Sequence, residues 1–184
     1  MVDFLPNDYQ VPQKAGNYMR WQDGENRFRI LVSPIIGWEG WIDTEDGNRK
    51  PIRHKMDEPF DPSEIDPETI KHFWAMSVWN YQEKRIQILE ITQKGIQKSL
   101  RALAKDEDWG SPLGYDIVVT KTGQKLETEY STNPKPAKSL QPEIVEAFKS
   151  ATIDLEALFR GDDPFGAKTK EVNPDDVPND LGEK

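Results

Sequence analysis

Large aromatic rings interleaved with cationic side chains are the residues of this 184-residue sequence with the clearest capacity for chemistry. They gather in two stretches, 27–55 and 71–85, of a chain that contains six tryptophans. Aromatic rings stack on nucleobases, with about 1–3 kcal/mol for each stacked base, and Arg or Lys side chains follow the phosphates of a single strand. The candidate binding residues are Arg27, Arg29, Trp38, Trp41, Arg49, Lys50, Arg53, Lys55, Phe73, Trp79, Tyr81, Lys84 and Arg85.

The competing interpretation is that the rings form core and the cations solubilise the surface. It accounts well for any single tryptophan. For the group it is weaker, because so many aromatics compete for a small interior that a few are expected to be exposed.

Catalytic and metal-binding chemistry finds little support in the residue types. The absence of cysteine excludes a thiolate nucleophile, a disulfide framework and cysteine-ligated zinc. The two histidines, His54 and His72, have no recognisable nucleophile beside them. Prolines interrupt the acidic stretch 57–68, which favours a solvated loop, and the piece DTEDGN at 43–48 fails the spacing of a calcium loop. We therefore expect a non-catalytic protein with no metal and no cofactor, and a small nuclease would lack both nucleophile and ligands.

The net charge of −9 argues against a nucleic-acid partner at first sight. The acids, however, are concentrated: residues 141–184 carry 11 acidic and 5 basic side chains, and six further acids lie within 57–68. The last 24 residues, 161–184, are acidic, rich in Pro and Gly and poor in apolar residues, which predicts disorder. The remaining body is free to present a basic surface.

The stretch 71–92 has the pattern of a β-hairpin, with two aromatic and β-branched arms around a polar break at 80–83. Alternation places Trp74, Met76 and Val78 on one face, the better candidate for the core. Phe73 and Trp79 fall on the other face, which we expect to meet the ligand, with Tyr81 if the strand continues.

Further elements flank this hairpin on both sides. A strand at 25–34 should stop or bend at Pro34, and a second extended piece should continue through 35–43 to a turn at Asp46-Gly47. A helix should follow Thr92, the candidate N-cap, with the apolar stripe Ile96, Leu100 and Leu103. A second hairpin turns at Thr122-Gly123, and a short helix begins at Pro142.

This order, a bent strand, a hairpin, a helix and a second hairpin, predicts a mainly β chain with short helices in an OB-fold, a five-stranded Greek-key barrel. A generic α+β domain has the same order of elements. The predicted organisation is an irregular arm at 1–22, the OB domain at 23–160 and the disordered acidic tail at 161–184.

Several motifs of the chain resemble the single-stranded DNA-binding proteins of tailed bacteriophages. They are DGENRFRIL, GWEGW, HFWAMSVWNY, IQILEITQKGIQKSL and EDWGSPLGYDI, and the similarity covers about residues 20–160. The resemblance implies an OB-fold core, binding of single strands with little sequence preference, and an acidic tail that meets replication and recombination proteins. Some phage members hold zinc with cysteines and histidine; this chain has no cysteine, so we expect none.

The expected partners are single-stranded DNA and, through the tail, replication and recombination proteins. No signal peptide and no run of 18 apolar residues is visible, so we expect no membrane contact and a cytoplasmic protein of the infected bacterial host. The alternative function is a protein–protein interaction module of a replication or virion assembly. Formation of a homo-oligomer, cooperativity and preference for DNA over RNA are left open by the sequence.

Overall fold

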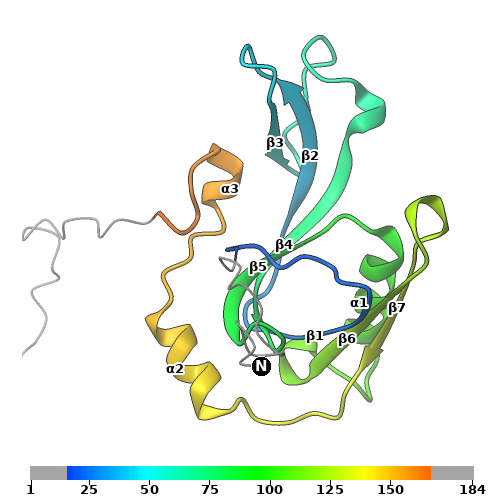
Figure 1. Ribbon diagram of the computed structural model, residues 1–184, viewed down its shortest axis with the longest axis vertical. Coiled ribbons are helices and arrows are strands. Elements are labelled where there is room, and N and C mark those ends of the chain that lie inside the picture. The colour runs from blue at the N-terminus through cyan, green and yellow to red at the C-terminus, as the bar shows by residue number, and fades with distance from the viewer. Residues whose placement is uncertain (1–15, 167–184) are drawn as a thin grey trace, which may run out of the picture.

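The computed structural model describes residues 16–166, and its fold is mainly β: an antiparallel sheet of seven strands with a few short helices (Figure 1). The strands are β1 (Gly24–Ile30), β2 (Ile35–Asp43), β3 (Arg49–Lys55), β4 (Lys71–Asn80), β5 (Arg85–Ile91), β6 (Asp116–Thr122) and β7 (Glu129–Pro134). The helices are α1 (Lys94–Lys105), α2 (Pro142–Ser150) and α3 (Ala157–Arg160), with 3-10 turns η1 (Pro67–Thr69), η2 (Pro112–Gly114) and η3 (Lys125–Glu127).

The long strand β4 is the centre of the sheet and pairs with β1, β2 and β5. β1 and β2 form one bent path along it, with Ile30 opposite Val78 and Ile35 opposite Ala75. Residues 31–34 thus lie opposite only two residues of β4, and such an irregularity bends a strand. The bend predicted at Pro34 is confirmed.

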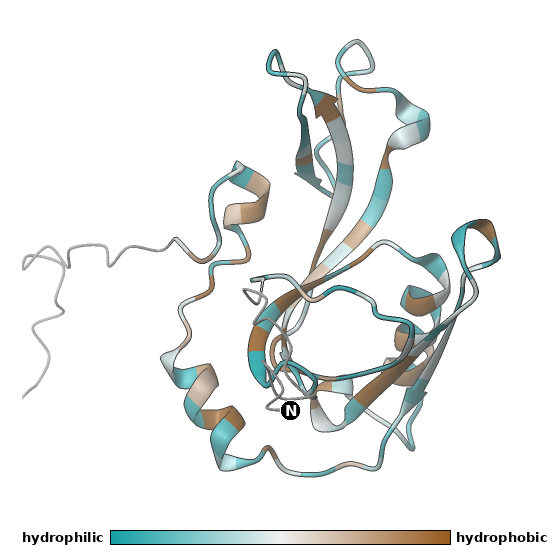
Figure 2. Ribbon diagram, in the orientation of Figure 1, coloured by the Kyte–Doolittle hydropathy of each residue, from teal (hydrophilic) through white to brown (hydrophobic). Residues whose placement is uncertain are grey.

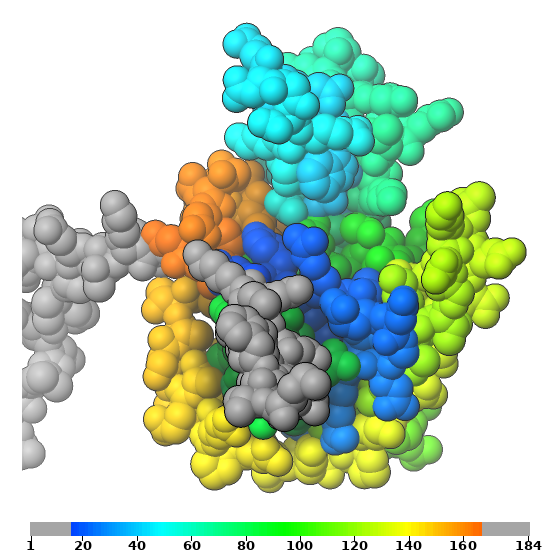
Figure 3. Space-filling view, viewed as in Figure 1, coloured from blue at the N-terminus to red at the C-terminus, as the bar shows by residue number. Residues whose placement is uncertain are grey.

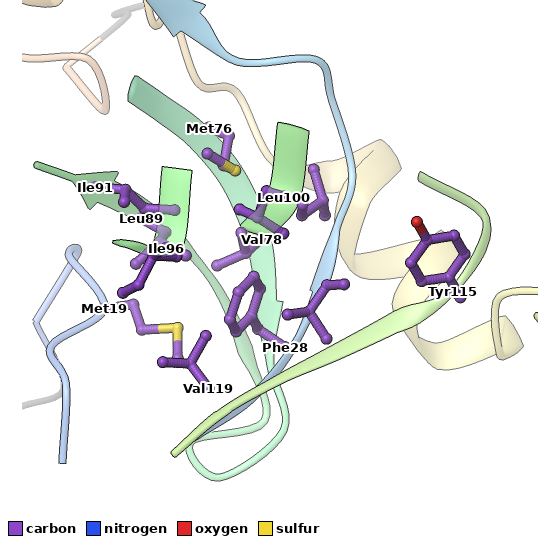
Figure 4. Packing of buried hydrophobic residues seen from close by; sticks show 12 residues of the cluster. Met19, Phe28, Met76, Val78, Leu89, Ile91, Ile96, Leu100, Tyr115 and Val119 are labelled. Carbon is purple, nitrogen blue, oxygen red and sulfur yellow. The ribbon is translucent and has the colours of Figure 1, made fainter. Parts of the chain in front are cut away.

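The main core fills the space between the sheet and α1. Alternation along β4 sends Met76 and Val78 inward, as predicted, and the stripe of α1 meets them through Ile96 and Leu100. Figure 4 shows these side chains converging with Phe28 and others from β1, β5 and β6. Each fully buried side chain of this kind contributes about 1.5–3 kcal/mol, so this cluster holds the sheet and α1 together.

The opposite face of β4 is also buried, contrary to the expectation that it is open to a ligand. Phe73, Ala75 and Ile88 form a second cluster with Leu158. The chain between α2 and residue 166 crosses this face and covers it with the partly buried side chains Ile153, Leu155, Phe159 and Phe165. Residues 161–166, assigned to the tail from the sequence, therefore belong to the packed body, and the rest of the predicted tail, 167–184, lies outside the described residues.

The sheet follows the order β3-β2-β4-β1-β6-β7, with β5 attached to β4. The described residues form seven strands rather than the predicted five, because the bent first strand divides into β1 and β2 and residues 49–55 add β3. Within residues 16–166 no pairing joins β5 to β7. The edge of β5 is instead paired with the N-terminal segment: Ile88 N donates to Asn17 O, and Met19 N donates to Ile88 O, both at 2.9 Å. Of the predicted arm 1–22, only this later part is described.

The β2–β3 hairpin and the first half of β4 form an arm that stands beyond the body (Figures 1 and 3). Its turn is hydrophilic, whereas apolar residues gather where the strands meet α1 (Figure 2). Segment 151–166 reaches the base of the arm, where Lys55 pairs with Glu156 at 3.6 Å. The predicted turn is confirmed at residues 44–48, with Gly47 at φ +75°.

The local signals around the remaining elements agree with the structure except at one cap. The second hairpin turns at Gly123, whose φ of +76° and close approach to Glu127 O leave no space for a side chain. α2 begins at Pro142 as predicted. α1 begins at Lys94 with Gln93 in the capping position, so the assignment of Thr92 as its N-cap is wrong.

Candidate nucleic-acid interface

A groove of about 760 Å³ lies between the base of the arm and the N-terminal half of α1. We call it the α1 groove. The topology brings the two walls of the groove together, because β5 leads directly from the sheet into α1 beside the start of β4. Its lining residues are Trp38, Met56, Glu68, Ile70, Lys71, His72, Trp74, Thr92, Gln93, Lys94, Gln97, Lys98 and Arg101.

Three aromatic rings from β2 and β4 line the groove and hold one another in place. Trp38 lies opposite His72 in the β2–β4 register, with ring centroids 5.2 Å apart. His72 Nδ1 donates to Gly37 O at 2.8 Å, which leaves Nε2 free to accept from Trp74 Nε1 at 3.1 Å. The two bonds fix the orientation of the His72 ring and orient Trp74. All three rings are only partly buried, so they retain surface for a flat ligand.

The cations of the groove come mainly from one face of α1. Lys94, Lys98, Arg101 and Lys105 follow each other at intervals of four, three and four residues, the spacing of one helical face. The first three line the groove together with Lys71 of β4. No acid of residues 16–166 forms an ion pair with any of these five cations.

The groove has little negative charge to oppose an anion. Among the residues that the structure describes, Glu68 is its single acidic lining residue. The N-terminal turn of α1 borders it through Gln93 and Lys94 and receives no side-chain cap. Uncapped N–H groups at a helix start carry partial positive charge, which adds to that of the lysines.

Among the residues predicted from the sequence, only Trp38 lines the groove. Trp41, three residues further along β2, is 41 % exposed on the arm opposite Pro51. Arg49 and Lys50 lie exposed on β3, where Arg49 is 3.4 Å from Asp43. Lys55 pairs with Glu156 as described. The arm therefore carries exposed candidates that the structure does not bring to the groove.

Arg27 and Arg29 are held by a buried carboxylate. Asp116 is fully buried and accepts from Arg27 Nη2 at 2.7 Å, Arg29 Nη1 at 3.4 Å and Tyr81 Oη at 2.9 Å. Burial raises the pKa of Asp116, but hydrogen bonds from Arg27, Tyr81 and Lys138 outweigh it and leave this pKa below its ordinary value. Arg29, with a side chain 4 % exposed, also donates to two backbone carbonyls. These arginines hold β1 to β6 and the segment after β7.

Tyr81 belongs to the same cluster. Burial, the hydrogen bond to Asp116 and the charge of that carboxylate raise the pKa of Tyr81 to about 12. The guanidinium of Arg27 lies 5.2 Å from the ring centroid, and Lys138 Nζ lies 5.6 Å from it. Two cations of the chain itself thus occupy the ring surface that a base would need.

Arg53 is enclosed by two carboxylates at the base of the arm. Its Nε is 2.9 Å from Glu39 Oε2, and its Nη2 is 2.8 Å from Glu90 Oε2. Burial, followed by the hydrogen bond and the charge of Glu90, raises the pKa of Glu39 to about 8. At neutral pH Glu39 is therefore protonated and hydrogen-bonds to Glu90, and the guanidinium of Arg53 lies between the two side chains.

The last four predicted residues lie on the covered side of the hairpin or at its turn. Phe73 is fully buried and Trp79 is 4 % exposed, so neither ring is open to a base in this structure. Lys84 is exposed in the turn with φ of +50°, and Arg85 donates to Asn17 at 3.4 Å.

Sequence reasoning missed most of the groove. Lys71, Trp74, Lys94, Lys98 and Arg101 were not among the predicted binding residues. The regular spacing of the α1 cations was a visible signal. Trp74 was assigned to the core, and it does pack against the main cluster while its remaining surface lines the groove.

Comparison with family models, curated proteins and solved structures finds no match to this chain. Within the part of the chain that the structure describes, no group of three His, Asp or Glu side chains is placed to hold a metal ion. No helix of residues 16–166 is long and apolar enough to cross a membrane. A proposal for the function therefore rests on the geometry of the α1 groove.

Proposed function

We propose that the protein binds single-stranded DNA in the α1 groove, with little sequence preference, in phage DNA replication and recombination. The observation that supports this most directly is the combination of three partly exposed rings with four cations that have no acidic partner among the described residues. Stacking is tolerant of sequence because every base has a flat face, and Lys or Arg contacts to phosphates do not read bases.

The energies of base stacking and phosphate contact are sufficient for a protein that is acidic as a whole to bind a single strand. Two or three stacked bases contribute about 1–3 kcal/mol each. Four phosphate contacts give a slope of about −2.8 in a plot of log affinity against log salt for a single strand. The exposed acids that face the solvent elsewhere are screened beyond about 8–10 Å at physiological salt.

At the level of the fold, we propose an OB-fold for the body. The β1–β2 path, β4, β5, β6 and β7 stand in the order of the five OB strands, with α1 between the third and fourth. The antiparallel neighbours β1·β4, β4·β5, β1·β6 and β6·β7 support the same assignment. β3 and the acidic loop are then an insertion between the first and second strands. The acidic residues toward the C-terminus are proposed to dock replication and recombination proteins.

The direct test is a titration of the protein with poly-dT, followed by tryptophan fluorescence across a salt series. We expect quenching at low salt and a salt slope near −2.8. Lys98→Ala and Arg101→Ala should each reduce the slope by about 0.7. Lys149→Ala, which removes an exposed lysine from α2, is the matched control and should leave the slope unchanged.

Absence of quenching by poly-dT at low salt would exclude the proposed function. The protein–protein interaction module would instead be favoured by a stable complex with another polypeptide that forms without nucleic acid and survives high salt.

A further inference from the structure

A second cavity, of about 410 Å³, continues the α1 groove along the helix. The two share Trp74 and Arg101. We call it the Leu113 pocket, and its lining residues are Ile30, Ser33, Pro34, Trp74, Met76, Leu100, Arg101, Ala104, Ser111, Pro112 and Leu113. On α1 the groove uses residues 94–101 and the pocket residues 100–104, so the pocket lies one turn further toward the C-terminal end of the helix.

The walls of this pocket suit the face of a heterocycle. They are apolar on three sides: Trp74 and Met76 from β4, Pro34 from the bend between β1 and β2, and Leu113 from η2. Leu113 remains 38 % exposed, a large apolar surface without a cover among residues 16–166. Ser33 and Ser111 add hydroxyl groups that can pair with the polar edge of a base.

The charges beside the pocket match a phosphate backbone rather than an acidic or a purely apolar partner. No Asp or Glu of residues 16–166 lines it. Arg101 stands where the groove and the pocket meet, and Lys105 follows one turn later on the same face of α1. From Lys94 to Lys105 the helix rises about 16 Å, which spans about five nucleotides at a stacked rise of about 3.4 Å each.

We infer that the Leu113 pocket is a second nucleobase subsite, which receives the base of a strand that leaves the α1 groove over Trp74. The strand would run along α1, with its phosphates beside Lys94, Lys98, Arg101 and Lys105. This inference rests on the proposed function and adds to it the path and the length of the bound strand. An apolar side chain of a protein partner is the competing occupant.

The test compares oligo(dT) of two to eight nucleotides on the full chain, with the pocket filled by Ala104→Phe. Ala104 is exposed on α1, so the larger side chain enters the pocket without disturbing the core. Ala102→Phe is the matched control, because Ala102 is also exposed on α1 but lines neither cavity. Circular dichroism should show equal helix content in both variants.

For the native chain and Ala102→Phe we expect affinity to rise up to about five nucleotides and then to level off. Ala104→Phe should bind the shortest oligonucleotides as the native chain does and lose about tenfold at the longer lengths, the equivalent of one stack. Equal length profiles for the two variants would overturn the subsite while leaving DNA binding in place. Failure of the native chain to bind any length would overturn the proposed function and the subsite with it.

An abasic scan gives an independent readout. A single abasic residue is moved through dT6, and the loss of affinity is measured for the native chain and for Ala104→Phe. At one position the loss should disappear in Ala104→Phe, because the variant has already removed that base from its pocket. Losses that are equal in both proteins at every position would contradict the subsite.

Discussion

The proton on Glu39 links the stability of the protein to pH. Its pKa is about 8 in the folded chain because of burial and the nearby Glu90, and it returns to about 4.5 when the chain unfolds. At any pH between about 4.5 and 8, folding is therefore accompanied by uptake of a proton at Glu39. The stabilising effect of this proton is complete below pH 4.5 and is lost as pH rises through 8.

We expect Glu39→Gln to remove this loss of stability at high pH, because the amide keeps the shape and the neutral charge of the protonated acid. Urea unfolding at intervals from pH 5 to 9 should show stability that declines in the native chain relative to the variant. Glu45→Gln, in the exposed turn of the arm, is the control and should follow the native curve. Parallel curves for the native chain and Glu39→Gln would show that Glu39 is ionised throughout.

Trp38 and Trp41 offer a matched pair for the site, since both belong to β2 and only Trp38 lines the α1 groove. Trp38→Ala should weaken binding of oligo(dT) about tenfold, the loss of one stacked base. Trp41→Ala should change it less than twofold. Fluorescence anisotropy with labelled dT10 measures both. A larger loss for Trp41→Ala would place the strand on the opposite face of the arm.

At the scale of elements, segment 151–166 is a structural layer over the outer face of β4 and β5. Leu158→Ala should therefore lower the free energy of unfolding by about 2–5 kcal/mol, the usual cost of this truncation in a core. Leu126→Ala, at a fully exposed leucine beyond β6, should leave it unchanged. Chemical denaturation of the two variants gives the comparison. Equal stabilities would mean that the segment does not cover the sheet in solution.

The elements themselves were largely predictable from local pattern. Alternation located β4 and its inward residues Met76 and Val78, and the apolar stripe located α1. The outer face of β4 could not be assigned in the same way. Phe73 is as apolar as any core residue, and whether it is covered depends on Leu158 and Phe159, which are more than 80 residues away in the sequence.

The candidate site was harder to predict because charges find their partners through the fold. Arg29 and Arg53 look like phosphate ligands in the sequence, but Asp116 and Glu90 reach them from other strands. The spacing of the α1 cations alone indicates that they share one face of the helix. That this face borders a groove with Trp38 and Trp74 follows from the topology, which the local sequence does not show.

At the scale of the whole molecule, the cations fall into two groups, those that have an acid beside them and those that do not. Arg27, Arg29 and Arg53 pair with acids from other strands, whereas the α1 cations have no acidic partner in residues 16–166. On a protein of net charge −9, these cations form a line of positive charge along α1 that would favour the approach of the proposed strand there. Such a field would orient an approaching strand toward α1 before contact.

The pairing of residues 17–19 with Ile88 bears on whether the edges of β5 in different molecules can associate. An unpaired strand edge is a template on which a second molecule can add its own strand, and long apolar edges aggregate in this way. The N-terminal segment takes up two backbone groups of Ile88 that would otherwise be open. If the protein coats a nucleic acid as proposed, its local concentration there would be high, and this pairing would limit sheet-to-sheet association of neighbouring molecules.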